Sequence, residues 1–480
     1  MLPPGLTRRL RDLVGDDGVV DHPDALLVYE CDGYTLERAV PDLVVLPRTP
    51  EEVAVVLGLL WAEGIPFVPR GAGTGLSGGT LPVEAPIMVC TSRLQEIESI
   101  DVANRRVVVQ AGVVNLWVSR AVSDADLLFA PDPSSQTACT IGGNVAENSG
   151  GPHTLKYGTT TNHVLALELV LPDGKLVQLG SATGMTVGYD LVGAVVGSEG
   201  TLGVVTEATM RLSPIPERVE TLLGIFGEVV SACRAVGRMI RSGLVPAALE
   251  IVDRRTIEAV EASVYAAGLP TDAGAVLIVE VDGPAPAVAR QVERVREHCV
   301  AEGADQVQVA RDEAERQRFW RARKGAFGAM GRLAPDLYVH DAVVPRRKLP
   351  EILESICEIG DRHGLRLSNV FHAGDGNLHP NISFDRRDAD EMARVLAAGE
   401  EILRTCVEAG GVISGEHGIG TEKRDFMGLL YSEADLEAMK KLRAAFDPTL
   451  VCNPGKLFPT TRFCVEANPK ARGYDQVPLG

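Results

Sequence analysis

The sequence predicts an α+β protein with more than one domain, and three observations lead to this. The chain has 480 residues, which at about 150 residues per domain allows roughly three folding units. Up to about Leu212, short β-branched runs alternate with glycine-rich loops, and after Pro216 strand-like and helix-like segments alternate. With 45% hydrophobic and 23% charged residues, the composition is that of a globular protein and excludes wholesale disorder.

A β-α-β unit is predicted near the start of the chain. Residues 43–46 have the pattern of a strand, and residues 65–68 that of a second strand. Between them Thr49 is a helix N-cap, Pro50 occupies the first helical position, and Gly64 ends the helix. Helical spacing predicts that its buried face consists of Val53, Val56, Leu57, Leu60 and Trp61.

Further elements are predicted along the chain. Strands are expected at 107–109 and 167–171, the latter ending in the turn 172–174, and a strand at 275–281 precedes a helix at 285–300. Pro214 and Pro216 indicate a domain boundary. Two later helices each have one apolar stripe, which predicts core packing: Leu349, Ile352, Leu353, Ile356 and Ile359 in one, and Met392, Val395, Leu396, Ile402, Leu403 and Cys406 in the other.

Charge and cysteine content exclude several classes of function. The net charge is 47 − 65 = −18, and no basic stripe stands apart from it, so a nucleic-acid partner is not expected. The nine cysteines form no CxxC pattern for zinc or iron–sulfur binding, and they suggest a reducing compartment. The longest apolar run, residues 53–62, is too short to span a bilayer. We expect a cytoplasmic protein, with peripheral contact at the inner face of the membrane left open.

The first glycine-rich patch, PRGAGTGLSGG at 69–79, predicts an anion site. Consecutive glycines let backbone N–H groups converge on a pyrophosphate. The patch contains GTGLSG, but a Rossmann loop must open a helix, and Thr80-Leu81-Pro82 follows instead. A phosphate-binding Walker loop is excluded because both Gly-Lys pairs precede leucine. A purely structural glycine turn remains the alternative.

Two more patches of glycine and amide residues occupy the same predicted domain. Residues 131–135 lead into TIGGNVAENSGG at 140–151, and GSEGTLG follows at 197–203. Three such patches favour a long wrapped ligand, because the pyrophosphate, ribityl chain and ring system of a dinucleotide all need close backbone donors.

A predicted metal site lies in the second half. His372 and His379 flank the tight turn Ala373–Leu378, and Glu416 lies in the segment GEHGIG at 415–420. Two imidazoles and a carboxylate suit Zn²⁺, Mn²⁺ or Fe²⁺. The competing interpretation is a pair of buried, hydrogen-bonded histidines.

A metal and a hydride-accepting cofactor together indicate oxidation of a 2-hydroxy acid. A metal lowers the pKa of the alcohol, a histidine takes its proton, and the cofactor accepts hydride from the carbinol carbon. The basic cluster at 316–324 is predicted to be one helix, and its Arg323 is the candidate for binding the substrate carboxylate through two parallel hydrogen bonds.

The ordered motifs resemble the FAD-linked oxidases of the vanillyl-alcohol-oxidase type. PRGAGTGLSGG, GGNVAENSGG, GSEGTLGV, FWRARKGAF, NVFHAGDGNLHP, SGEHGIGTEKR and NPGK carry the resemblance, which spans about residues 41–459. It points to the branch that holds D-lactate dehydrogenase, D-2-hydroxyglutarate dehydrogenase and the flavin subunit of glycolate oxidase. The resemblance implies a two-part FAD-binding domain of the PCMH type, with a ferredoxin-like antiparallel cap. The expected boundaries are 1–215 for the FAD domain, 216–424 for the substrate cap, 425–460 for a returning segment and 461–480 for a loose tail.

The resemblance also implies roles for individual residues. FAD would be bound without a covalent link, since residues 70–79 contain no His or Cys. The metal ligands would be His372, His379 and Glu416, the base His417, and the carboxylate clamp Arg323. The implied cofactor-binding residues are Pro69, Arg70, Gly71, Ala72, Gly73, Thr74, Gly75, Leu76, Ser77, Gly78, Pro131, Asp132, Ser134, Ser135, Gly142, Gly143, Asn144, Asn148, Gly151, Glu199, Gly203, Val204, Val205, Asn377 and Asn453.

One departure from the family bears on the substrate. Relatives that oxidise the diacid 2-hydroxyglutarate carry a lysine where Val339 stands here. Without that cation a second carboxylate is poorly matched, which favours a short acid such as glycolate or D-lactate. Because the chain has no iron–sulfur cysteine pattern, electrons are expected to leave to a partner protein, such as an iron–sulfur subunit, or to a quinone. Three alternatives remain: a dehydrogenase of D-2-hydroxyglutarate or another D-2-hydroxy acid, an accessory flavin subunit without catalysis, and a flavin-free iron enzyme.

Overall fold

The computed structural model describes residues 2–185 and 187–460, and the chain divides into two compact units. Of the described residues, unit 1 comprises 2–150, 158–215 and 416–460, and unit 2 comprises 151–157 and 216–415. Each unit has sheets and a hydrophobic core of its own. The predicted tail, 461–480, lies outside the described residues.

The predicted β-α-β unit is present at the start of unit 1. Strands β2 (Leu43–Val45) and β3 (Phe67–Arg70) both pair in parallel with β4 (Ile87–Cys90), and β1 (Val19–Val20) adds an antiparallel edge. Between β2 and β3 runs α3 (Pro50–Ala62), which packs beside α1 (Leu6–Val14). As predicted, the hydroxyl of Thr49 caps α3 by accepting the N–H of Glu52.

Two details of that prediction are wrong. β3 begins at Phe67 rather than at residue 65, because the N–H of Ile65 bonds to Leu60 O at the end of α3 and Pro66 has no N–H to pair. Trp61 is 39% exposed, so it does not belong to the buried face of α3. The other four residues of that face are fully buried.

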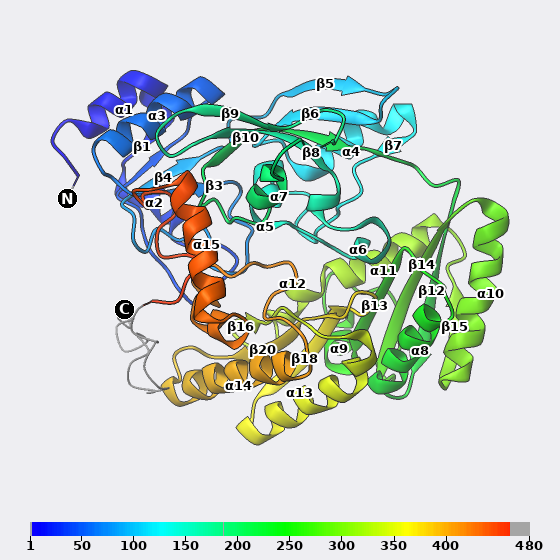
Figure 1. Ribbon diagram of the computed structural model, residues 1–480. Helices are drawn as coiled ribbons and strands as arrows, with labels where there is room; N and C mark the ends of the chain where they lie inside the picture. Colours follow the sequence, from blue (N-terminus) through cyan, green and yellow to red (C-terminus); the bar gives the residue numbers. More distant parts are fainter. Residues whose placement is uncertain (1, 186, 461–480) are drawn as a thin grey trace. The chain divides into compact units, whose positions relative to one another are not determined.

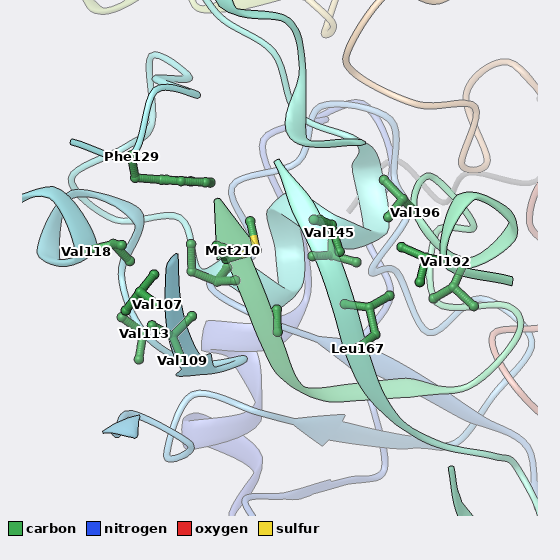
Figure 2. Close-up of a cluster of buried hydrophobic side chains, with 14 of the residues drawn as sticks. Val107, Val109, Val113, Val118, Phe129, Val145, Leu167, Val192, Val196 and Met210 are labelled. Atoms are coloured by element: carbon green, nitrogen blue, oxygen red, sulfur yellow. The ribbon is translucent and has the colours of Figure 1, made fainter. Parts of the chain in front are cut away.

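The second sheet of unit 1 has five antiparallel strands in the order β5-β6-β10-β8-β9. They are β5 (Ile97–Asp101), β6 (Arg106–Gln110), β8 (Val164–Val170), β9 (Leu176–Gly180) and β10 (Val204–Arg211). β7 (Leu127–Leu128) and β11 (Ser213–Pro214) form a separate pair. Figure 2 shows the core on this sheet, where valines of β6 and Met210 of β10 pack with Val145 of α5 (Ile141–Glu147). Short helices complete unit 1: α2 (Pro23–Leu26), α4 (Asn115–Val122) and α7 (Leu191–Val195).

The last described segment returns to the first sheet of unit 1. After α15 (Glu433–Phe446) the chain forms a parallel bridge between Cys452 and Phe67 of β3. The N–H of Phe67 donates to Val451 O at 2.9 Å, and the N–H of Asn453 donates to Phe67 O at 2.8 Å. Backbone pairing therefore fixes residues 451–453 beside the strand that leads into the first glycine patch.

Unit 2 contains the antiparallel sheet that the cap prediction requires. Strands β12 (Arg218–Phe226), β13 (Ala248–Asp253), β14 (Ala275–Gly283) and β15 (Ala304–Val309) lie in the spatial order β15-β12-β14-β13. With α8 (Val229–Arg241) after β12 and α10 (Ala285–Ala301) after β14, they make a ferredoxin-like βαββαβ unit (Figure 1). α9 (Arg254–Glu261) is an addition between β13 and β14.

The sheet continues beyond β13 into β18 (Arg366–His372), β19 (Asn377–Leu378) and β17 (Ala342–Val343). β16 (Asp336–Val339) pairs with β20 (Pro380–Phe384), which pairs with β18. The predicted apolar stripes lie in α13 (Leu349–His363) and α14 (Ala389–Glu408), which pack against each other. The remaining helices are α6 (Thr154–Tyr157), α11 (Glu313–Lys324) and α12 (Ala326–Met330).

Helices α9, α11 and α12 share one core with inward residues of β13 and β14. The basic cluster at 316–324 does form a single helix, α11, as predicted. None of the helices in the described part of the chain is both long and apolar enough to cross a bilayer.

Candidate active site

The turn between β18 and β19 brings two predicted ligands together in unit 2. His372 ends β18 and pairs in register with Asn377, the first residue of β19. Asp375 accepts the N–H of Asn377 at 3.1 Å, and Gly376 has φ +88°, where a Cβ would lie 2.3 Å from Val344 O. As a result the rings of His372 and His379 lie 5.2 Å apart, edge to face, and a nitrogen of one is within 4.8 Å of a nitrogen of the other.

A buried cation and a buried acid adjoin His372. Arg323, in the last turn of α11, is 1% exposed, and its Nε donates to Glu250 of β13 at 2.6 Å. The other carboxylate oxygen of Glu250 lies 2.8 Å from His372 Nδ1. Arg323 Nη1 is buried and has no hydrogen-bond partner among the described residues. A buried guanidinium with an unused N–H group is suited to a small carboxylate ligand.

The charge state of Glu250 follows from these neighbours. Burial alone would raise the pKa of this carboxyl group, but the charge of Arg323, with the hydrogen bonds from Arg323 and His372, outweighs burial and holds its pKa below the ordinary value. Glu250 is therefore an ionised acceptor that balances the charge of Arg323.

A second buried acid, Asp341, holds the segment that leads to Glu416. One carboxylate oxygen of Asp341 accepts the Ser414 hydroxyl at 2.7 Å and the Gly415 N–H at 2.9 Å. The other carboxylate oxygen of Asp341 lies 3.9 Å from His379 Nδ1. His379 Nδ1 also lies 3.1 Å from the backbone oxygen of His340. Glu416 follows Gly415 by one peptide bond and, with His417, begins the last part of unit 1. Within unit 2, the imidazoles of His372 and His379 are donors of the kind that zinc and divalent transition metals prefer.

The first glycine patch of unit 1 has the features of an anion cradle. Within the part of the chain that the structure describes, no backbone N–H of residues 72–77 donates to another protein group. By contrast, the carbonyl groups at the end of the patch are occupied. Ser77 O accepts the N–H groups of Thr421 and Glu422, and Gly79 O accepts the side-chain amide of Asn453. Backbone N–H groups that have no protein acceptor, next to carbonyl groups that are already hydrogen-bonded, suit an anion such as a pyrophosphate.

Close packing explains two glycines in this patch. A Cβ on Gly71 would lie 2.4 Å from the hydroxyl of Thr140, the N-cap of α5, so the first and second patches touch only because Gly71 has no side chain. Gly73 has φ +69°, and a Cβ there would lie 2.1 Å from the guanidinium of Arg70. The glycine patches of unit 1 therefore adjoin each other, which fits one extended ligand such as FAD.

The side chains of the second patch bond to protein groups. Asn144 accepts the amide of Asn115 at 3.0 Å and donates to the Ser149 hydroxyl at 3.2 Å. Asn148, at φ +52°, accepts the N–H of Thr161 at 2.9 Å. These amides shape the loop, and the N–H groups of Gly142 and Gly143 also bond within the protein, to Ala111 O and the Thr140 hydroxyl. Of the predicted cofactor-binding residues, Gly151 and Asn377 lie in unit 2, and the others lie in unit 1.

The third patch connects to the returning segment through Glu199. Its carboxylate accepts the N–H groups of Ile419 and Gly420 at 2.6 and 2.7 Å, and its backbone O accepts the amide of Asn453 at 2.7 Å. The predicted role of Glu199 in cofactor binding therefore cannot rest on a free carboxylate. Gly203 has φ +147°, and Val204 and Val205 pair with β8 as the first residues of β10.

Several ionisable groups are buried beneath the patches of unit 1. Burial and the charge of Glu199 raise the pKa of Glu147 well above its ordinary value. Burial also raises the pKa of Glu199, although the two N–H groups that it accepts oppose this. Burial lowers the pKa of Lys456 to about 8, and its ammonium group donates to Leu81 O.

Sequence reasoning missed two buried acids, Glu250 and Asp341, and one half-buried acid, Glu147. Glu250 left a readable signal, because it is a charged residue in the interior of the strand pattern ALEIVD, at a position that alternation places on the same face as Ala248 and Val252. Glu147 lies within the second patch and Asp341 two residues after Val339, but only the fold reveals that Asp341 is buried and that Oε2 of Glu147 is shielded from solvent.

Two family descriptions match the chain. "FAD binding domain" matches residues 41–180, and "FAD linked oxidases, C-terminal domain" matches residues 215–457. The chain is 46% identical to "Glycolate oxidase subunit GlcD" of Escherichia coli, over 95% of this chain and 91% of that protein. It is 33% identical to "D-lactate dehydrogenase" of Anaerostipes hadrus, over 93% of this chain and 94% of that protein.

The fold is also found among solved structures. That of p-cresol methylhydroxylase with substrate bound superposes with a TM-score of 0.81 at 17% identity, covering 94% of this chain and 96% of that one. At such low identity the likeness concerns the fold, and it agrees with the predicted two-part FAD-binding architecture with an antiparallel cap.

Proposed function

The chain belongs to the FAD-linked oxidases, and we propose that it oxidises a short 2-hydroxy acid, glycolate or D-lactate, to the 2-oxo acid. Both named relatives have substrates of this class in their names, and this chain covers most of their length. The accessory-subunit rival is less well supported, because the chain carries a complete set of candidate catalytic side chains.

One observation carries the proposal: a buried arginine with an unused donor adjoins a histidine pair in unit 2. Arg323 Nη2 lies 3.4 Å from His372 Nδ1, and Nη1 has no partner in the described structure. A 2-hydroxy acid presents a carboxylate one bond from the hydroxyl-bearing carbon. An arginine next to a metal-binding histidine can therefore hold the carboxylate while the hydroxyl group lies near the histidines.

We assign metal binding to His372, His379 and Glu416, with Zn²⁺ or Mn²⁺ as the expected ion. The histidine pair and the tethering of Gly415 by Asp341 support this, since Glu416 is the next residue in the chain. A divalent ion, when bound, lowers the pKa of the substrate hydroxyl group.

The protein's own groups then have distinct tasks. Arg323 binds the substrate carboxylate and fixes which face of C2 is presented. His417 accepts the hydroxyl proton as the C2–H bond breaks, and the C–O bond becomes the carbonyl of the product. FAD, when bound along the glycine patches without a covalent link, supplies the acceptor for the hydride from C2. A hydride, which is one proton with two electrons, thus leaves C2, and the hydroxyl proton goes to His417.

A small monocarboxylate is the favoured substrate. Val339 of β16 offers no cation for a second carboxylate. A diacid would then leave its distal charge unpaired at this position, which favours glycolate or D-lactate. The electrons are proposed to leave to a partner protein, such as an iron–sulfur subunit, or to a quinone.

The first test is anaerobic mixing of the FAD-loaded protein with glycolate, D-lactate, L-lactate and D-2-hydroxyglutarate, followed by flavin absorbance. Bleaching by glycolate or D-lactate is expected, with little by L-lactate or the diacid. No bleaching by any of the four acids, with or without added Zn²⁺ or Mn²⁺, would contradict the proposal.

His417→Ala should slow flavin reduction by about 10²–10⁴-fold, the usual contribution of a general base. FAD content should stay at the wild-type level, because the patch donors at 72–77 are untouched. Stopped-flow absorbance measures the rate and the flavin-to-protein ratio measures loading. His298→Ala is the control, since this histidine of α10 bonds Ser242 outside the site. Wild-type reduction rates in the His417 variant would remove it from the mechanism.

A further inference from the structure

We propose that Glu250 is a positioning residue that orients both His372 and Arg323, fixing the histidine tautomer that can bind a metal and the guanidinium edge that can bind a carboxylate. This deepens the proposed function and rests on it for the identity of the two ligands. Glu250 is 0% exposed and lies in the middle of β13, where the strand register pairs it directly with His372 of β18.

The proton position on His372 follows from its neighbours. Nδ1 lies 2.8 Å from Glu250 Oε1 and 3.4 Å from Arg323 Nη2. An ionised carboxylate only accepts and a guanidinium only donates, so one Nδ1 atom cannot bond both. The shorter contact to the carboxylate requires Nδ1–H. In the neutral ring Nε2 then carries the lone pair, which is the form a metal ion needs.

The same carboxylate sets the direction of Arg323. The 2.6 Å hydrogen bond from Arg323 Nε to Glu250 Oε2 uses the Nε–H group of the guanidinium. Nη1 is left buried without a partner in the described structure. Glu250 therefore selects which N–H groups of Arg323 remain for a ligand.

A second acid on the same sheet provides an internal comparison. Ala248 pairs with Glu280 across β13 and β14, so Glu280 lies on the face that Glu250 shares. Helix α11 places Arg316, Trp320 and Arg323 at i, i+4 and i+7, and thus over both acids. Glu280 bonds Arg316 at 2.9 Å, Trp320 at 2.7 Å and His153 at 3.1 Å.

The two clusters differ in what they leave available. Arg316 also uses Nη1, which donates to Glu313 at 3.0 Å, whereas Arg323 Nη1 has no partner in the described structure. The arginine of the Glu280 cluster thus has no N–H edge left for a ligand, whereas the arginine of the Glu250 cluster has. Glu280→Gln is therefore a matched control for Glu250→Gln.

The test measures metal binding to the FAD-loaded protein directly. Apparent dissociation constants for Zn²⁺ and Mn²⁺ are determined by equilibrium dialysis for the wild type, Glu250→Gln and Glu280→Gln. In Glu250→Gln one oxygen can still accept from Arg323, but the amide N–H₂ then faces Nδ1 and favours the tautomer with Nε2–H. The dissociation constant should rise by about 10–100-fold, as for loss of a ligand's hydrogen-bond partner. In Glu280→Gln it should change by less than about twofold, since none of its partners is a proposed ligand.

A tautomer measurement separates this inference from the proposed function. Histidine ¹⁵N chemical shifts are measured on the FAD-loaded, metal-free protein, and the His372 signal is identified as the one that His372→Gln lacks. The shifts should indicate Nδ1–H in the wild type and in Glu280→Gln. Glu250→Gln should lose that signature. This result supports the positioning role even if the wild type binds neither metal, an outcome that would count only against the metal assignment. An unchanged His372 tautomer in Glu250→Gln, or equal loss of metal binding in both variants, would overturn the inference.

Discussion

At the scale of single residues, buried charges in this protein are matched by charges and N–H groups from distant parts of the chain. Glu280 illustrates the balance: burial would raise the pKa of its carboxyl group, but bonds from His153 and Arg316 outweigh burial and lower it. Asp32 lacks a comparable cation contact. Burial raises its pKa to about 6, and the N–H of Tyr34 with the charge of Arg70 offsets only part of this.

Asp32 should therefore make stability depend on pH. The carboxyl group is more readily protonated in the folded state than in the unfolded state, where its pKa is the ordinary 3.8. The contribution of Asp32 to the free energy of unfolding should thus decline as pH rises from about 4 through about 6, by about 3 kcal/mol in total. Asp32→Asn keeps an oxygen for the Tyr34 N–H and removes the titration.

Urea unfolding at several pH values between 4 and 8, for the wild type and Asp32→Asn, measures this effect. The variant should gain about 3 kcal/mol relative to the wild type on going from acid to pH 8. Parallel pH profiles for the two proteins would rule out a raised pKa at Asp32.

At the scale of elements, local signals account for the helices and alternation accounts for the strands. The α3 cap is a clear case, because Thr49 accepts the Glu52 N–H at 3.2 Å and Pro50 fills the first helical position, as the sequence predicts. The exposure of Trp61 marks the limit of such signals, since helical spacing gives a face but not how far a partner sheet extends along it.

Thr49→Ala should lower the free energy of unfolding by about 1 kcal/mol, because an N–H of the first turn of α3 loses its acceptor. Thr49→Ser retains the hydroxyl group and should stay close to the wild type. Urea unfolding followed by circular dichroism compares the three proteins. A serine variant as unstable as the alanine variant would mean that the methyl group, not the cap, matters.

At the scale of the whole molecule, the two units have separate cores and different candidate ligands. The glycine patches of unit 1 are built from residues before 206, while the histidine pair and Arg323 belong to unit 2. A ligand that binds only the folded state stabilises the unit that holds it.

Removal of FAD should therefore lower the unfolding temperature of unit 1 more than that of unit 2. Restoring free FAD to 100 times its dissociation constant should return about 2.7 kcal/mol of stability. Calorimetry with and without FAD measures the two transitions, and tryptophan fluorescence of a Trp61→Phe, Trp117→Phe double variant, in which Trp320 is the remaining tryptophan, identifies the transition of unit 2. Equal shifts in both units would show that they unfold as one cooperative body.

The sequence by itself determined the fold class, the FAD-binding family and the candidate donors, because glycine patches, caps and histidine turns are local patterns with local causes. The contacts of Glu250 and Asp341 came from the tertiary structure alone, since a carboxylate in a strand or loop acquires its role only from what the fold packs against it. It also showed that Glu199 is bonded to Ile419 and Gly420, more than 200 positions away in the chain. Such contacts depend on long-range packing, for which a single sequence carries no local signal.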